Sequence, residues 1–190
     1  MAKTESTFVN MLVVLFAVSL IASMSLAAIY NITEEPIAKS KALKKEKAIA
    51  GVLPEFDKIE TFNVLPPTGK DSVEFNVAFK GSDAIGVAIE TYTDNGFGGR
   101  IKAMVGIKLD GTIHDVVHLE HKETPGLGDK VDKKKSVWSD QFKGKGNDNF
   151  PLVVKKDGGE VDAITAATIT SRAYCDAINR AYESYKKWRE

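Results

Sequence analysis

The amino-acid sequence predicts an α+β protein: a single N-terminal transmembrane helix followed by a mostly antiparallel sheet domain with packing helices. Residues 8–30 carry no charged side chain and are largely aliphatic. Residues 73–119 contain four short runs in which apolar side chains alternate with others, as in strands with one buried face. Residues 174–188 repeat apolar side chains at intervals of three and four, the period of an amphipathic helix. Together, these three patterns predict the α+β class.

The apolar run at residues 8–30 is the first element. At 1.5 Å per residue, a helix of this length crosses a hydrocarbon core of about 30 Å. A cleaved signal peptide is the alternative, with Ser25-Leu26-Ala27 as its cleavage site. Because Lys3 is the only basic side chain before the run, the sequence favours a retained anchor, which we place at residues 1–33.

A stalk helix is expected next, at residues 34–52. Thr33-Glu34-Glu35-Pro36 combines a cap residue, an acidic first turn and an early proline, whereas Gly51 and Pro54 predict an end. The stalk lysines form either a solvated face or a surface for anionic lipid headgroups. Counted by the positive-inside rule, these lysines place the following domain in the cytoplasm.

The remaining residues, 53–190, are expected to form one domain, which is large enough for a single hydrophobic core. Strands are predicted at residues 73–79, 84–91, 101–109 and 113–119, with turns at Gly81-Ser82-Asp83, Asp94-Asn95-Gly96 and Asp110-Gly111.

Composition excludes several classes of function. The chain has 26 basic and 26 acidic side chains, so it has no charge pattern typical of nucleic-acid binding. Its single cysteine, Cys175, excludes an internal disulfide and a site built on paired cysteines. Cys175 lies beside the apolar face of the last helix, which predicts a buried thiol of low reactivity.

Two further patterns suggest ligand sites that we do not expect. His114, His118 and His121 resemble a metal-binding series, but on a strand His121 points to the opposite face from the other two, so no metal is predicted. Gly96-Phe97-Gly98-Gly99 resembles a nucleotide loop, yet a strand follows it where a nucleotide-binding fold requires a helix. We interpret it as a turn.

The segment from Asp162 to Ser171 is the strongest candidate site, because small and hydroxyl residues gather directly before the last helix. Free backbone N–H groups and the positive dipole end favour an anion there, and small side chains allow a phosphate to approach. The alternative is that Thr170 or Ser171 only caps the helix.

This segment also resembles a known signature. Residues 162–168 are similar to the Asp-x-x-(Ser/Thr)-Gly-Ala-Thr pattern of flavin-carrying domains, in which the final threonine is esterified to the phosphate of FMN. The match makes Thr168 the carrier residue. Ala166 departs from the pattern, which usually has glycine there, and an added methyl group reduces backbone freedom.

The resemblance extends over roughly the second half of the chain. The motifs at residues 96–99, 105–113, 121–130 and 138–142 follow in the order found in the G subunit of the Rnf ion-translocating electron-transport complex. The resemblance implies an electron-relay subunit of a membrane-bound ion-translocating ferredoxin:NAD oxidoreductase. Such a subunit carries covalent FMN and contributes to the activity of the complex without catalytic residues of its own.

The resemblance also implies site residues and partners. Asp162 would be recognised by a separate flavin transferase, and the partners would be the other subunits and the lipid bilayer. The domain would lie on the extracytoplasmic (periplasmic) side of the inner membrane. The lysines after the span predict the opposite side, but long translocated domains do not have to follow the positive-inside rule. Besides Thr168, the residues around the flavin would be Thr165, Ala166, Ala167, Glu123, Thr124, Pro125, Gly126, Leu127, Gly128 and Lys130.

Two alternative functions stay open at this point. The C subunit of the sodium-pumping NADH:quinone reductase shares the domain, although its larger extracytoplasmic portion fits this chain less well. The second is a membrane-anchored, non-redox binding module whose threonine-rich segment only caps a helix.

Overall fold

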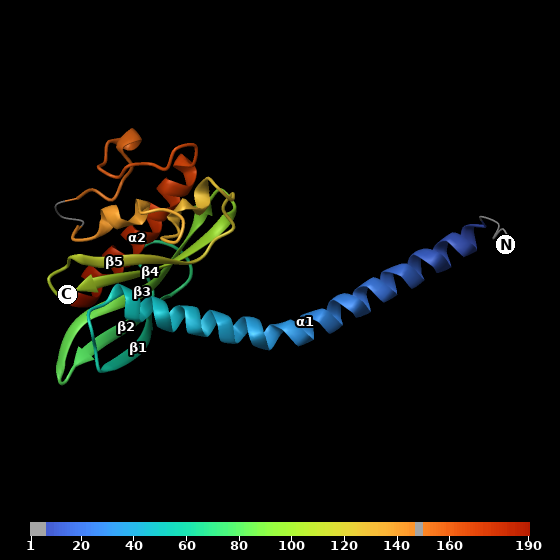
Figure 1. Ribbon diagram of the computed structural model, residues 1–190, viewed down its shortest axis with the longest axis horizontal. Coiled ribbons are helices and arrows are strands. Elements are labelled where there is room, and N and C mark those ends of the chain that lie inside the picture. The colour runs from blue at the N-terminus through green and yellow to red at the C-terminus, as the bar shows by residue number, and fades with distance from the viewer. Residues whose placement is uncertain (1–6, 147–149) are drawn as a thin grey trace. The chain divides into compact units, whose positions relative to one another are not determined.

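The computed structural model describes residues 7–146 and 150–190 (Figure 1). The chain divides into two compact units, one up to Lys44 and one from Lys45 to Glu190. Helix α1 (Phe8–Val52) begins in the first unit, and its last two turns belong to the second. Among the described residues, α1 is the one helix long and apolar enough to cross a membrane, which supports the predicted anchor.

Helix α1 runs without interruption through the position where a second helix was expected to begin. Thr33 does not act as a cap, because its hydroxyl donates to the carbonyl of Ile29 at 2.8 Å inside the helix. Pro36 also lies within α1. A cap is needed only where the preceding chain is not helical, and here the anchor helix continues. The end of the helix at Val52 agrees with the prediction, whereas the domain boundaries at residues 33 and 52 stay predictions.

The second unit is built on one five-stranded antiparallel sheet, with the strands in sequence order (Figure 1). The four predicted strands are confirmed, and the structure adds a strand at one edge. That strand escaped prediction because most of its side chains are exposed, so it has little apolar alternation. The strands are β1 (Lys58–Val64), β2 (Val73–Lys80), β3 (Asp83–Gly96), β4 (Gly99–Lys108) and β5 (Ile113–Glu120).

Helix α2 (Thr168–Arg189) covers one face of this sheet and confirms the predicted amphipathic helix. Its apolar side chains, among them Tyr174 and Ile178, pack against Phe75, Ile89 and Ile101 from three neighbouring strands. The main hydrophobic core therefore lies between α2 and the sheet.

The end of α1 covers part of the opposite face. Ala48, Ile49 and Val52 pack on Ala88 and Met104 in a second, smaller core. The ammonium group of Lys45, the first residue of the second unit, contacts the carboxylates of Glu74 at 2.5 Å and Glu90 at 2.8 Å. The last turns of α1 are thereby tied to β2 and β3.

A buried arginine joins α2 to the sheet. Arg180 is 7% exposed, donates to the carbonyl of Thr68 at 2.8 Å and to that of Tyr92, and stacks over the Tyr92 ring at 4.8 Å. Cys175, one turn earlier, is buried as predicted, and its burial raises the pKa of the thiol to about 12. The thiol is therefore protonated at neutral pH and unreactive.

Candidate functional site

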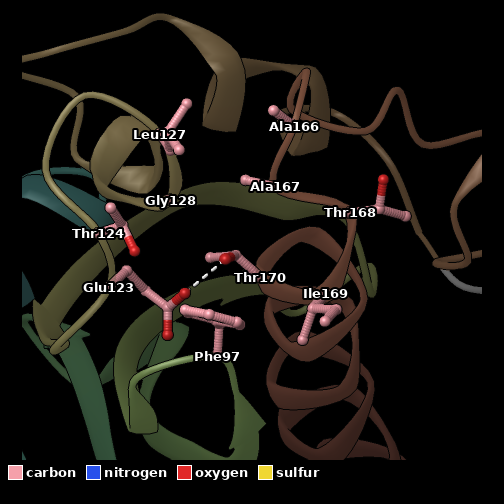
Figure 2. A pocket seen from close by; sticks show the side chains of 10 residues that line it. All are labelled: Phe97, Glu123, Thr124, Leu127, Gly128, Ala166, Ala167, Thr168, Ile169 and Thr170. Atoms are coloured by element: carbon pink, nitrogen blue, oxygen red, sulfur yellow. Dashed lines mark hydrogen bonds between the residues drawn. The ribbon is translucent and has the colours of Figure 1, made fainter.

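A cavity of about 390 Å³ lies at the N-terminal end of α2 (Figure 2). Three segments that are distant in sequence meet there: the turn between β3 and β4, the loop after β5, and the start of α2. A cavity of this size falls in the range of small-molecule and cofactor sites. Its lining residues are Phe97, Glu123, Thr124, Leu127, Gly128, Ala166, Ala167, Thr168, Ile169 and Thr170.

Most of the predicted site residues meet at this cavity. Thr168 and the two alanines before it lie on one side, and Glu123, Thr124, Leu127 and Gly128 lie on the other. Four predicted residues lie near the cavity without lining it. Of these, Thr165, Pro125 and Gly126 are exposed, and Lys130 belongs to a short 3-10 helix, η1 (Gly128–Val131).

The sequence interpretation missed three lining residues, Phe97, Ile169 and Thr170. The first two had a signal in the sequence. Phe97 is a large apolar residue among glycines, and Ile169 lies off the apolar face of α2. In the structure Phe97 is 69% exposed. Thr170 had no such signal, because its partner Glu123 is 47 positions away.

The alternative interpretation, in which a side chain at Thr170 or Ser171 caps α2, does not hold. The helix begins at Thr168, and no side chain caps it within the described chain. Ser171 is fully buried, donates to the carbonyl of Ala167 at 3.0 Å and accepts from the amide of Ile164 at 2.9 Å. The interpretation of Thr170 or Ser171 as the N-cap is therefore wrong.

These bonds bear on the expectation, taken from the flavin-carrying resemblance, that backbone amides around Thr165 to Thr168 hold the phosphate. The amide of Ala167 donates to the carbonyl of Ile164 at 3.0 Å, so it is already engaged. The first amide to bond back into the helix is that of Ser171, which donates to Ala167 at 3.0 Å. The amides of residues 168–170, in the first turn, have no acceptor within the helix and are suited to bind an anion, whereas the amide of Ala167 is not.

Ala166 has an unusual backbone conformation. Its φ is 62°, which makes it the one non-glycine residue with positive φ among those the structure describes. A side chain in this left-handed region costs roughly 1–2 kcal/mol, because Cβ crowds the following carbonyl oxygen. Glycine, which the flavin-carrying signature usually has at this position, adopts such a conformation without that strain.

We expect Ala166→Gly to stabilise the protein. The strain relieved by glycine exceeds the entropic cost of adding a glycine by about 0.5–1 kcal/mol. The Tm of the protein should therefore rise by roughly 2 °C. Ala167→Gly is the matched control, because Ala167 is buried and has a φ of −136°. It should be destabilising, and an equal gain in both variants would contradict the strain at Ala166.

A cationic group lies beside the Thr168 hydroxyl. The ammonium of Lys156 donates to the Thr168 Oγ1 atom at 3.4 Å from another short 3-10 helix, η3 (Lys155–Asp157). Arg172 of α2 binds the carboxylate of Asp157 through two bonds of 2.6 and 2.7 Å, which lowers the pKa of Asp157. This pair holds η3 next to the first turn of α2.

Two side chains of η2 (Trp138–Phe142) hold the segment that precedes Thr168. The Trp138 indole N–H donates to the carbonyl of Asp162 at 2.5 Å, and the Gln141 side-chain oxygen accepts from the Asp162 amide at 2.8 Å. The Asp162 carboxylate is 70% exposed and pairs with Lys155 at 2.7 Å. The backbone of Asp162 is therefore fixed while its side chain faces solvent.

Glu123 joins the three segments around the cavity (Figure 2). It is 5% exposed, and its Oε1 atom accepts from the amide of Gly98 at 2.9 Å. Its Oε2 atom accepts from the hydroxyl of Thr170. The loop after β5 is thus connected to the β3–β4 turn and to α2.

The histidines are arranged differently from the strand prediction. The rings of His118 and His121 lie 5.1 Å apart, although strand alternation would separate them. The reason is that β5 ends at Glu120, so alternation does not reach His121. The described residues contain no group of three or more side chains suited to a metal ion.

Comparison with known proteins places this geometry in a family. Residues 96–183, which include the entire lining of the cavity, match the FMN-binding domain model. The G subunit of the ion-translocating oxidoreductase complex of Escherichia coli K12 is 34% identical over 168 residues, which cover 82% of this chain and 80% of that protein. The protein of the same name from Shewanella amazonensis is 33% identical over 177 residues, 85% of this chain and 80% of its own length.

A third relative matches more strongly over a shorter stretch. The protein of this name from Shewanella loihica is 45% identical over 107 residues, which cover 55% of this chain and 50% of that protein. The aligned part of this chain thus spans about half the length of that relative. The two longer alignments extend over most of both chains. The chain therefore belongs to the family of G subunits of ion-translocating oxidoreductase complexes, and it contains an FMN-binding domain.

Proposed function

We propose that this chain is the electron-relay subunit of a membrane-bound ion-translocating ferredoxin:NAD oxidoreductase complex, and that it holds FMN in the cavity at the start of α2. The observation that carries the proposal is the meeting of three distant segments around Thr168, inside the region that matches the FMN-binding domain. The names of the relatives support membership of a redox complex. Bound FMN supplies the electron transfer, and the chain supplies its position.

The lining residues suit FMN chemically. Phe97, Leu127 and Ile169 offer apolar surface to a flat aromatic ring, while Ala166 and Gly128 leave room beside it. At the other end of the ligand, the first turn of α2 and the ammonium of Lys156 suit a phosphate.

We further propose that the phosphate is esterified to Thr168. The Thr168 oxygen would form a bond to the phosphorus of an activated flavin nucleotide and lose its proton. The bond from that phosphorus to a nucleoside phosphate leaving group would break, and a separate flavin transferase would direct the step. The exposed carboxylate of Asp162, on a fixed backbone, is a suitable recognition point for that enzyme.

A covalent bond would keep FMN in the cavity, where non-covalent binding to the start of the helix is too weak to do so. The dipole of a helix N-terminus contributes at most about 2 kcal/mol, whereas nanomolar affinity requires about 12 kcal/mol. The apolar lining is partly open to solvent, with Leu127 40% and Ile169 49% exposed. An ester keeps the cofactor in place while one edge of the ring stays accessible to the redox groups of neighbouring subunits.

The mass of one tryptic fragment tests this proposal. Cleavage after Lys156 and Arg172 releases residues 157–172, which contain Thr168. In protein made by cells that contain the transferase, we expect this fragment to be heavier by one FMN adduct and the denatured protein to fluoresce in a gel. Yellow protein that loses its flavin on denaturation would overturn the ester. Colourless protein would instead favour a non-redox binding module.

We propose that the domain faces the extracytoplasmic side of the inner membrane and that residues 8–30 stay as a single-pass anchor. The lysines after the span argue against this side, but long domains translocate largely regardless of charge. Protease added to sealed spheroplasts should digest the domain. Protection until the membrane is broken would place the domain in the cytoplasm.

A further inference from the structure

We infer that Glu123 lowers the reduction potential of the flavin by holding a fixed negative charge beside the ring. The inference rests on the proposed function, because it requires FMN in the cavity that Glu123 lines. It goes further by assigning one residue and one direction to the control of the potential.

The Glu123 carboxylate lies inside the cavity, out of bulk water. Figure 2 shows the Glu123 side chain reaching from its loop towards Thr170, with Phe97 beside it. The side chain is 5% exposed, yet it lines the cavity. Its charge is therefore shielded from bulk water while it faces the ligand, and charges interact more strongly in such surroundings.

The carboxylate is held in this position by hydrogen bonds to both of its oxygens. Gly98 and Thr170 each donate to a different oxygen, so both oxygens accept a hydrogen bond as an ionised carboxylate can. Two glycines leave just enough room for the Glu123 side chain. A Cβ atom at Gly96 would lie 2.8 Å from Glu123 Oε1, and one at Gly128 would lie 2.8 Å from Glu123 Cβ.

Among the described residues, no cationic side chain pairs with the Glu123 carboxylate. The buried Asp129 nearby in sequence differs, because it pairs with Lys135 at 2.6 Å. Reduction adds negative charge to a flavin, so an uncompensated carboxylate beside the ring disfavours the reduced form. The reduction potential falls as a result.

The test is an equilibrium redox titration of the flavinylated full-length chain, followed by flavin absorbance. Glu123→Gln removes the charge and can keep both contacts, because its oxygen accepts from Gly98 and its amide donates to the Thr170 hydroxyl. We expect the equilibrium constant for reduction to rise about tenfold, which is about 30 mV for a two-electron couple.

Thr170→Val distinguishes an electrostatic role of Glu123 from a structural one. It removes one hydrogen bond to Glu123 and keeps the charge, so its potential should fall below that of the wild type. Glu160→Gln, at an exposed acid outside the cavity, should leave the potential unchanged. If Glu123 had only a structural role, the reduction potentials of Glu123→Gln and Thr170→Val would shift in the same direction.

The outcomes distinguish this inference from the proposed function. An unchanged potential in Glu123→Gln, or a rise in Thr170→Val, would overturn the role of Glu123 while the flavin site stands. If Glu123→Gln fails to hold flavin, Thr170→Val decides alone, and a potential at or above that of the wild type rejects the inference. A wild-type chain without flavin would overturn the proposed function itself.

Discussion

Thr168→Val is expected to abolish covalent attachment of flavin completely. Valine keeps the branched shape of threonine at the first position of α2 but has no oxygen that can bond to phosphorus. Because the Thr168 side chain makes one described hydrogen bond, at 3.4 Å to the exposed Lys156, its loss should change the free energy of unfolding by less than about 0.5 kcal/mol. Gel fluorescence and the mass of residues 157–172 measure the attachment.

Two other substitutions make this test specific. Thr168→Ser keeps a hydroxyl at the same position and should retain the flavin. Thr165→Val removes an exposed hydroxyl that lies three residues away in the same fragment, and it should also retain the flavin. Fluorescence that persists in Thr168→Val and disappears in Thr165→Val would move the attachment to Thr165.

The sequence predicted the elements whose signals are local. Strands β2 to β5 are each rich in buried apolar residues, and α2 has one continuous apolar face. Strand β1 lacked that signal because most of its side chains are exposed. The continuous α1 was missed for the opposite reason, since Thr33 and Pro36 resemble a helix start wherever the preceding residues are ignored.

The same distinction applies to the site. The signature around Thr168 is contiguous, so the sequence alone marked it. The contact between Glu123 and Thr170, and the approach of Phe97, depend on how the sheet brings the three segments together. No local pattern encodes such contacts. The strain at Ala166 was predictable only in part. The resemblance showed that alanine replaces the usual glycine, but only the φ of 62° shows that this alanine has a strained backbone.

Gly106→Ala is expected to cause the largest loss of stability. Gly106 lies in β4 under the last turn of α1, and a Cβ atom there would lie 1.8 Å from the carbonyl oxygen of Val52 and 2.7 Å from the carbonyl carbon. Both are backbone atoms, and Val52 is fully buried. A rotamer change cannot relieve the clash, so the end of α1 must move off the sheet.

This displacement would open the smaller core and strain the contacts of Lys45 with Glu74 and Glu90. We expect a loss of about 3 kcal/mol in the free energy of unfolding, or roughly 6–12 °C in Tm. Both tryptophans, Trp138 and Trp188, lie in the unit from Lys45 to Glu190. Tryptophan fluorescence during urea unfolding in detergent therefore measures this unit, whatever the state of the anchor.

Gly51→Ala is the matched control for this substitution. It adds the same methyl group in the last turn of α1, where no atom outside the neighbouring residues and the backbone of the helix itself lies within 4 Å of the new Cβ. Because alanine favours a helix over glycine, stability should be unchanged or should rise by up to about 1 kcal/mol. If Gly106→Ala were as stable as Gly51→Ala, the end of α1 would not be packed on β4. If only Gly106→Ala loses stability, glycine is required at this position because the backbone of α1 rests directly on the strand.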